Sequence, residues 1–404
     1  MALSLPQDFV PLMEEQYGKD VASQLCHALL HTDPEVSVRL NPRKRPQPLN
    51  NEERSECCDS PLRLEAVPWC PEAYYLSERP SFTMDPLLHA GAYYVQEASS
   101  MYLADVLSRH LSDDARTALD LCAAPGGKST LLAGLLSEGS TLICNEPVPK
   151  RAQVLSENIQ KWTRMPQGRY PVRCVVTQQM PIDFSRFTDC FDLIVTDVPC
   201  SGEGMFRKDE EAVRGWSLEQ VRLCSERQRD IVETIWPCLR EGALLVYSTC
   251  TFNRFEDEDN VRWICEHLGG TLLEERHFLP GRDRGEGFYI AAIRKLSEES
   301  DTRDAQRRPL PTMSGMHVLY DTVQAPACET DTVALTYDEA LHYLRGEALH
   351  LAAPRGPVTL TYRGLPLGEG KSVGTRINNL YPASWRIRTT YLSRFSLLPV
   401  FSED

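Results

Sequence analysis

The chain has 404 residues, 42% of them hydrophobic, which is enough for two or three domains with hydrophobic cores. It has no run of 18 apolar residues and no secretory signal at its start, so we expect a cytoplasmic protein without a membrane span. The net charge of -14 argues weakly against a nucleic-acid partner, although local basic patches such as residues 41–46 can still bind one.

Residues 1–90 are rich in proline and form a first unit of mixed character. Residues 8–30 carry apolar side chains at helical spacing, and residues 36–45 are typical of a strand that leads into a basic turn.

The pattern becomes regular from residue 117 to residue 295, where short apolar runs alternate with helical stretches. This alternation predicts an α/β fold, a parallel sheet with helices on both faces. Ligands in such sheets bind at the carboxyl ends of the strands. The residues expected at these ends are Cys122, Glu146, Asp197, Cys200 and Cys250.

Residues 296–309 are charged and almost devoid of apolar side chains, which is typical of a linker. Residues 310–404 form a smaller unit rich in Thr, Tyr, Leu, Gly and Pro, and we expect short strands there, for example within residues 357–367.

The stretch LDLCAAPGGKST (119–130) follows an expected strand and opens an expected helix. A glycine-rich turn in this position lets backbone N–H groups and the helix N-terminus face a ligand. A phosphate-binding loop of an NTPase would need glycine at position 122, where the chain has cysteine, and Pro125 has no N–H to offer a phosphate. The NTPase interpretation is therefore disfavoured.

Glu146 ends the second strand of this pattern and precedes a helix. An acid there suits the ribose hydroxyls of a dinucleotide or of an adenosyl cofactor, but it also suits a helix cap, and the sequence does not separate the two. The absence of a G-x-G-x-x-G motif makes a dinucleotide the less favoured ligand.

The 14 cysteines include no C-x-x-C pair, which argues against zinc, and we expect no metal. Most free cysteines in proteins are simply small buried residues. Cys200 and Cys250 differ from the rest, because each lies at the end of an expected strand and within a long polar motif.

Five stretches resemble the Nol–Nop–Sun family of RNA cytosine-C5 methyltransferases. Three look like signature motifs of the family: LDLCAAPGGKST, TDVPCSGEGMFRKD (196–209) and YSTCTFNRFEDEDNV (247–261). Residues 90–101 and 281–293 are similar to two further family segments, and residues 364–382 resemble the C-terminal RNA-binding region of the bacterial RsmF branch.

The resemblance implies a Rossmann-like class I methyltransferase domain over residues 91–295 that uses S-adenosyl-L-methionine. It also implies an N-terminal RNA-binding extension over residues 1–90 and an α+β, PUA-like RNA-binding domain over residues 310–404. The residues expected to bind the cofactor are Cys122, Ala123, Ala124, Pro125, Gly126, Gly127, Lys128, Glu146 and Asp197.

The family chemistry explains the two thiols. A thiolate that adds to C6 of cytosine makes C5 nucleophilic enough to accept a methyl group. By resemblance, Cys250 is this nucleophile and Cys200 assists product release. Asp197 would hold the cytosine, and Lys128 could lower the pKa of a thiol.

Two points stay open at this stage. DNA cytosine methyltransferases carry their nucleophile in a Pro-Cys motif, which would assign that role to Cys200. In addition, much of the family has an aspartate after the third strand that contacts the adenine side of the cofactor, whereas this chain has Gln178, Gln179 and Met180 there. Either a main-chain contact replaces it, or Asp183 reaches in.

Chemistry on a base requires the base to leave its stack, so we expect single-stranded or locally opened RNA as substrate. Small-subunit ribosomal RNA or the assembling subunit is the favoured partner. A tRNA substrate and a non-catalytic RNA-binding assembly factor are the alternatives. The candidate phosphate-binding residues are Arg43, Lys44, Arg45, Arg207, Lys208, Lys371, Arg376 and Arg386, with Arg388 in the same tail.

Overall fold

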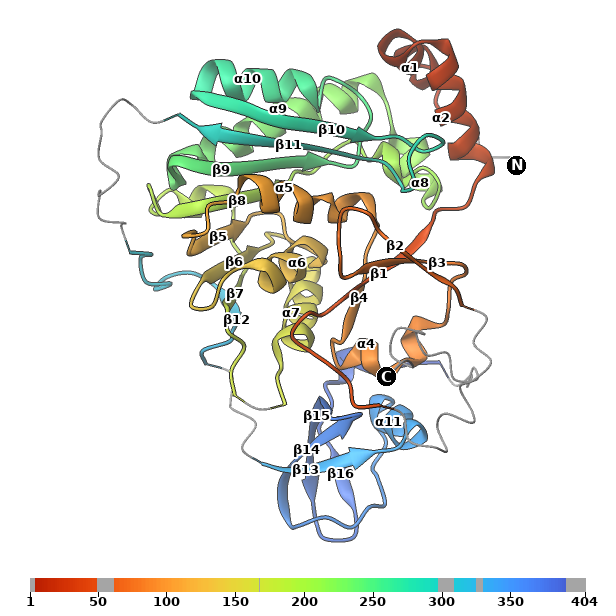
Figure 1. The fold of residues 1–404 in the computed structure, drawn as a ribbon, viewed down its shortest axis with the longest axis vertical. Helices are drawn as coiled ribbons and strands as arrows, with labels where there is room; N and C mark the ends of the chain where they lie inside the picture. Colours follow the sequence, from red (N-terminus) through yellow and green to blue (C-terminus); the bar gives the residue numbers. More distant parts are fainter. Residues whose placement is uncertain (1–3, 49–61, 167, 297–308, 325–329, 390–404) are drawn as a thin grey trace.

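The computed structural model describes residues 4–48, 62–166, 168–296, 309–324 and 330–389. Within these ranges the chain forms three sheets along one long axis, with two N-terminal helices at one end and the C-terminal sheet at the other (Figure 1). None of the helices in the described ranges is both long and apolar enough to cross a lipid bilayer.

The N-terminal unit is a helix pair followed by a small sheet of order β2-β3-β1-β4. The helical spacing of residues 8–30 is confirmed, but it forms two helices that are separated at Gly18, whose φ of 79° favours glycine. The expected strand in residues 36–45 is also confirmed. The elements are α1 (Phe9–Tyr17), α2 (Lys19–His31), β1 (Val36–Leu40), β2 (Leu64–Ala66), β3 (Ala73–Leu76), η1 (Phe82–Met84), α4 (Pro86–His89) and β4 (Tyr93–Val95).

The central sheet has the order β10-β11-β9-β8-β5-β6-β7-β12. Its strands are β5 (Thr117–Asp120), β6 (Thr141–Asn145), β7 (Arg173–Thr177), β8 (Phe191–Asp197), β9 (Leu239–Thr249), β10 (Gly270–Phe278), β11 (Phe288–Lys295) and β12 (Val318–Asp321). The longer helices are α5 (Leu103–His110), α6 (Gly127–Leu135), α7 (Pro149–Thr163), α9 (Leu218–Ile235) and α10 (Glu258–Leu268). The short ones are η2 (Ser99–Tyr102), η3 (Pro181–Phe184), η4 (Glu203–Met205), α8 (Glu210–Gly215) and η5 (Trp236–Cys238).

The expectation of a parallel sheet is correct for the five central strands and wrong at both edges. β10 and β11 form an antiparallel hairpin whose second strand pairs with β9, because a short connection between neighbouring strands reverses the chain. β12 pairs antiparallel with β7 at the other edge.

The placement of β12 corrects the expected domain boundary. The sequence pattern places residues 318–321 in the C-terminal unit. In the structure they form hydrogen bonds with the backbone of the edge strand β7. The C-terminal sheet begins only at β13 (Asp331–Leu335). Most of the expected linker, residues 297–308, lies outside the described residues.

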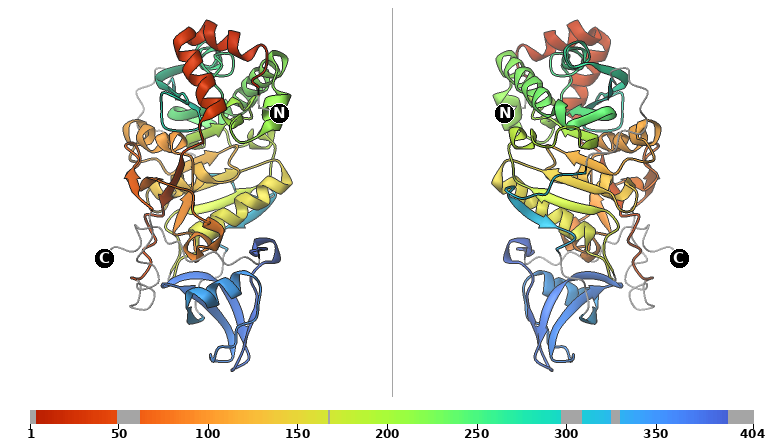
Figure 2. Two further views of the ribbon diagram at one scale, coloured as in Figure 1. Left: turned by 90° about the vertical axis from the view of Figure 1, so that its right-hand side faces the viewer. Right: turned by 90° about the vertical axis from the view of Figure 1, so that its left-hand side faces the viewer.

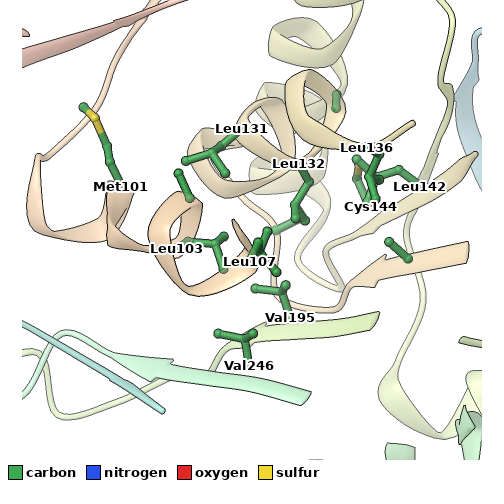
Figure 3. Close-up of a cluster of buried hydrophobic side chains, with 14 of the residues drawn as sticks. Met101, Leu103, Leu107, Leu131, Leu132, Leu136, Leu142, Cys144, Val195 and Val246 are labelled. Carbon is green, nitrogen blue, oxygen red and sulfur yellow. The ribbon is translucent and has the colours of Figure 1, made fainter. Parts of the chain in front are cut away.

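Helices cover both faces of the central sheet, as the edge-on views show (Figure 2). On one face, leucines of α5 and α6, among them Leu107 and Leu132, pack against strand residues such as Val195 of β8 (Figure 3). On the other face, α9 and α10 contribute Val232 and Ile264. Burial of each such side chain stabilises the fold by roughly 1.5–3 kcal/mol, so these layers hold the carboxyl edge of the sheet in a fixed geometry.

The C-terminal sheet has the order β13-β14-β15-β16 and confirms the strands expected in residues 357–367. The hairpin turns at Arg363 and Gly364, whose φ values of 47° and 76° are both positive, as a two-residue type I′ turn requires. The remaining elements are α11 (Tyr337–Leu344), β14 (Gly356–Tyr362), β15 (Leu365–Ser372), β16 (Ile377–Asn379) and η6 (Ala383–Trp385).

The C-terminal sheet and the N-terminal sheet share one hydrophobic core. Tyr343 and Leu344 of α11 belong to the same buried cluster as Leu87 of α4 and Val38 of β1. The backbones also connect, since Gln47 N donates to Arg363 O at 2.8 Å. The two units therefore form one packed body beside the central domain.

Candidate active site

The glycine-rich stretch forms a loop between β5 and α6 and lines a cavity of about 180 Å³. Gly126, just before α6, has a φ of 118°, a left-handed conformation that favours glycine. The lining residues are Tyr94, Val95, Gln96, Glu97, Ser100, Asp120, Cys122, Ala123, Ala124, Pro125, Gly127, Lys128 and Asp197. The structure thus brings together most of the residues expected at a cofactor. It adds five residues that precede the loop in the chain: Tyr94, Val95, Gln96, Glu97 and Ser100.

Asp120 at the end of β5 is a cavity residue that the sequence reasoning missed. Its side chain is buried, and Oδ2 accepts a hydrogen bond from Ser129 Oγ at 2.6 Å. Oδ1 has no hydrogen-bond partner in the described part of the chain. Burial raises the pKa of this carboxyl to about 7. The position of Asp120 at a strand end, beside the glycine-rich loop, was the signal that could have identified it.

Arg39 of β1 holds the same loop from the N-terminal unit, a contact that no local sequence pattern indicated. Its guanidinium is buried and donates to Gln96 Oε1 at 3.0 Å, to Gly127 O at 3.1 Å and to Thr130 Oγ1 at 2.7 Å. It also lies over the Trp162 ring, 4.8 Å from the centroid. The start of α6 is therefore fixed by a charged side chain from another unit.

Glu146 follows β6 as expected and is buried. Its Oε1 accepts from Val148 N at 3.0 Å, and its Oε2 lies 3.3 Å from Arg151 NH2. These contacts hold the turn that leads into α7, but Val148 is the N-cap residue of that helix and no side-chain cap hydrogen bond forms there among the described residues. Glu146 is not among the residues that line the cavity.

Asp183, one candidate for the missing adenine contact, is exposed. Its Oδ2 accepts from Met180 N at 2.9 Å, which caps the short helix η3. The backbone of Gln179 is held from both sides by Asn145, through hydrogen bonds of 3.0 Å each.

Cys200 and Cys250 leave the parallel neighbours β8 and β9 at the same edge, and their Sγ atoms lie 3.3 Å apart. Both are free thiols and both are partly buried. Gly204 N donates to Cys250 O at 2.8 Å, and a Cβ at position 204 would lie 2.9 Å from that oxygen, so only glycine permits this approach.

The two thiols differ in their surroundings. The hydrogen bond with Cys250, together with burial, raises the pKa of Cys200 well above its usual value. Burial beside Cys250 therefore disfavours a negative charge on Cys200 in the free protein.

Lys128 and Asp197 form an ion pair of 2.9 Å on the wall of the cavity. Ser248 Oγ donates to Asp197 Oδ1 at 2.9 Å, and the Lys128 ammonium lies 4.8 Å from the centroid of the Phe288 ring. Burial lowers the pKa of Lys128, but Asp197 outweighs it and the net pKa is raised. Lys128 therefore stays charged, close enough to Cys250 to interact with a thiolate there.

The expectation that residues 43–45 all bind phosphate is wrong for Lys44. It is buried, and its Nζ donates to Ala90 O and Lys161 O at 2.6 Å each. Arg43 is half-buried and donates to Leu136 O at 3.2 Å. Arg45 alone keeps an exposed head, with 69% of its side chain accessible. All three residues carry a positive charge, and they differ only in how far the packing of the fold buries their side chains.

The other basic candidates also divide by their contacts. Arg207 donates to Gly285 O at 2.5 Å, and Lys208 pairs with Glu286, so both hold the loop before β11. Arg386 is half-buried and donates to Tyr381 O. Lys371, Arg376 and Arg388 are exposed, as RNA contact requires.

Asp257, Glu258 and His277 bring possible metal-ligand atoms within 4.8 Å of one another. His277 Nε2 lies 3.0 Å from Glu258 Oε1, and Asp257 Oδ1 accepts from Thr249 Oγ1 at 2.6 Å. These hydrogen bonds account for the grouping without an ion.

Comparisons with known proteins show the family of this chain. Residues 109–294 match the family model of the 16S rRNA methyltransferase RsmB/F, residues 5–98 match the N-terminal domain of RsmF, and residues 330–387 match the RsmF PUA domain. The chain belongs to the RsmB/F methyltransferase family. The three matches cover residues of all three sheets, although β12 lies outside them. The fold is that of a class I methyltransferase with an N-terminal domain and a C-terminal PUA domain.

Several relatives carry the name ribosomal RNA small subunit methyltransferase F. That of Salmonella arizonae is 30% identical over 354 residues, which cover 78% of this chain and 70% of the relative. That of Aliivibrio fischeri (strain MJ11) is 32% identical over 321 residues, 72% of this chain, and the match spans only 64% of that relative's length. That of Cronobacter sakazakii is 29% identical over 93% of this chain and 82% of its own.

Solved structures share the fold. PH0851 aligns with a TM-score of 0.60 and 22% identity, covering 72% of this chain and 66% of its own. NSun6 from Pyrococcus horikoshii, solved with SFG, aligns with a TM-score of 0.59 and 20% identity, covering 74% of this chain and 100% of its own.

Proposed function

We propose that this protein is an S-adenosyl-L-methionine-dependent RNA cytosine-C5 methyltransferase that acts on small-subunit ribosomal RNA. The observation that carries the proposal is the pair of thiols 3.3 Å apart beside a cavity lined by the glycine-rich loop and by the Lys128–Asp197 pair. Two sulfur atoms at that distance can act on neighbouring atoms of one ring.

The cavity suits a cationic cofactor such as S-adenosyl-L-methionine. The partnerless oxygen of Asp120 supplies negative charge for a cation, and the loop from Cys122 to Lys128 forms the adjoining wall. Glu146 would contact the ribose with a remaining lone pair. When bound, the cofactor supplies an electrophilic methyl group to C5 of the base.

The protein's residues supply the rest of the chemistry. The Cys250 thiolate adds to C6, and the displaced electron pair of the C5–C6 bond becomes available at C5. After C5 is methylated, its proton leaves to a base, the double bond re-forms and the C6–S bond breaks, which regenerates the thiolate. The 3.3 Å separation supports a role for Cys200 in this release, as the base or by directing one.

Asp197 and Lys128 would act on the base. The Asp197 side chain is 37% exposed, so it can accept a hydrogen bond from the exocyclic amine of cytosine while it keeps its ion pair. The positive charge of Lys128 would attract the sulfur anion of Cys250 during its attack on C6.

Trapping with RNA that contains 5-fluorocytidine tests the cysteine roles, because fluorine at C5 prevents release of the adduct. We expect a covalent adduct at Cys250 that is lost in Cys250→Ala. We expect Cys200→Ala to accumulate an adduct with ordinary RNA, since release is impaired. An adduct at Cys200 in the Cys250→Ala protein would reverse the assignment.

The names of the curated relatives and the PUA match favour ribosomal RNA over tRNA. Bisulfite sequencing of RNA from cells with and without the protein identifies the target, and a tRNA cytosine would refute this part. Transfer of labelled methyl groups from the cofactor to RNA separates an enzyme from a non-catalytic assembly factor. A ribosomal substrate would place the protein in the cytoplasm.

A further inference from the structure

The two loops that carry the cysteines exchange buried glutamates. Glu256, from the loop after Cys250, accepts a hydrogen bond at 3.0 Å from Ser201 N, the residue next to Cys200. Glu203, from the loop after Cys200, accepts at 2.6 Å from Phe252 N, two residues beyond Cys250. Each carboxylate therefore holds the backbone beside the other loop's thiol.

Asn253 connects the two carboxylates. Its Nδ2 donates to Glu203 Oε1 and to Glu256 Oε1, at 2.9 Å in both cases. Trp216 Nε1 also donates to Glu203, at 2.9 Å, and Gln228 Nε2 to Glu256, at 2.7 Å. In all of these contacts the partner group donates the hydrogen bond and the glutamate oxygen accepts it.

This arrangement is costly, which makes a role in packing alone a poor explanation. Both glutamates are fully buried, and a buried carboxylate is tolerated only when several hydrogen bonds replace its water. Burial and the neighbouring charge of Glu256 raise the pKa of Glu203 to about 7. Apolar side chains could fill the same space, but they could not bind two backbone N–H groups.

We propose that Glu203 and Glu256 are a reciprocal pair of positioning residues that sets the distance between the thiols of Cys200 and Cys250. The hydrogen bond from Gly204 N to Cys250 O, at 2.8 Å, adds a third connection between the loops. The kinetic part of this inference rests on the proposed function, whereas the geometric part does not.

Substitution by glutamine tests the pair with little change of shape. In Glu203→Gln or Glu256→Gln, an amide N–H₂ replaces one acceptor oxygen and faces donors, so the contact is lost while the volume is kept. Glu274→Gln is the matched control, because Glu274 lies on β10, outside these loops, and pairs with Arg109 and His110 of α5. Ser201→Ala is a milder variant if glutamine prevents folding, because it removes the hydroxyl contacts to Glu256 and Asn253 and keeps the bond from Ser201 N to Glu256.

Thiol proximity is measured by cross-linking with dibromobimane, followed by peptide mapping of the Cys200–Cys250 bridge. We expect efficient bridging in the wild type and in Glu274→Gln, and loss of most of it in the two glutamine variants, with a partial loss in Ser201→Ala. Unchanged bridging in folded Glu203→Gln and Glu256→Gln proteins would overturn the proposal.

The kinetic readout separates positioning from general damage. We expect kcat to fall by about 10- to 100-fold in either glutamine variant, as for a small misplacement of reacting groups. Cofactor affinity by calorimetry stays unchanged, because neither glutamate lines the cofactor cavity. Equal losses of kcat and cofactor affinity would overturn the positioning role. A wild type that bridges its thiols but never methylates RNA would instead refute the proposed function.

Discussion

Arg39→Lys tests whether the N-terminal unit shapes the cofactor loop. The arginine donates from Nε to Gln96 and from NH2 to Gly127 and Thr130, so its two edges face different partners. Lysine has one terminal nitrogen and cannot serve both edges. The substitution keeps the charge and loses at least one charge-assisted hydrogen bond.

The expected cost follows from that loss. A hydrogen bond to a charged group contributes about 1.5–3 kcal/mol, which corresponds to a fall in melting temperature of roughly 3–12 °C for a domain of this size. If the loop must be ordered when the cofactor binds, the free energy of the lost hydrogen bond is subtracted from that of cofactor binding. The affinity for the cofactor then falls by about tenfold or more.

The assay is calorimetric titration with S-adenosyl-L-methionine together with thermal unfolding. Arg240→Lys is the control, because Arg240 is similarly buried but pairs with Asp192 at the amino ends of the strands, away from the cavity. It should lower stability and leave cofactor affinity intact. Wild-type affinity in a folded Arg39→Lys protein would refute the reasoning.

Three further outcomes are expected. Lys128→Met leaves Asp197 without its cation and should slow single-turnover methyl transfer by about 100-fold, whereas Lys128→Arg should retain part of the rate. Asp120, with its pKa raised to about 7 by burial, ionises as pH rises from 6 to 8. Cofactor affinity, compared with Asp120→Asn, should therefore rise roughly tenfold over that range, and parallel pH profiles would contradict this. Lys371→Gln and Arg376→Gln should each weaken RNA binding and lower the slope of affinity against salt by about 1, with unchanged slopes arguing against phosphate contact.

The local sequence pattern was sufficient to predict those features of the fold that depend on residues close together in the chain. The alternation of apolar runs and helical stretches predicted the five parallel strands, and strand ends predicted that Cys200 and Cys250 would share an edge. The same reasoning was wrong for β12, because which strand caps an open sheet edge depends on a segment far along the chain.

Burial of charged residues could not be predicted from the pattern of charges. Arg43, Lys44 and Arg45 are adjacent in sequence, yet Lys44 is enclosed by backbone carbonyls and Arg45 faces solvent. Nothing in the local pattern around Arg39, the fourth residue of β1, indicated that its side chain would reach Gly127.

The sequence by itself determined the alternation of strands and helices, the glycine-rich loop and the two thiols at strand ends, because hydrophobic periodicity and turn residues act over a few positions. Only the tertiary structure decided the contacts that join distant segments: Arg39 on the cofactor loop, the exchanged glutamates between the cysteine loops, and the core that the N- and C-terminal sheets share. Such contacts depend on which faces of the helices and sheets pack together. The desolvation of a charged group depends on all the atoms around it in space, not only on its neighbours in the chain.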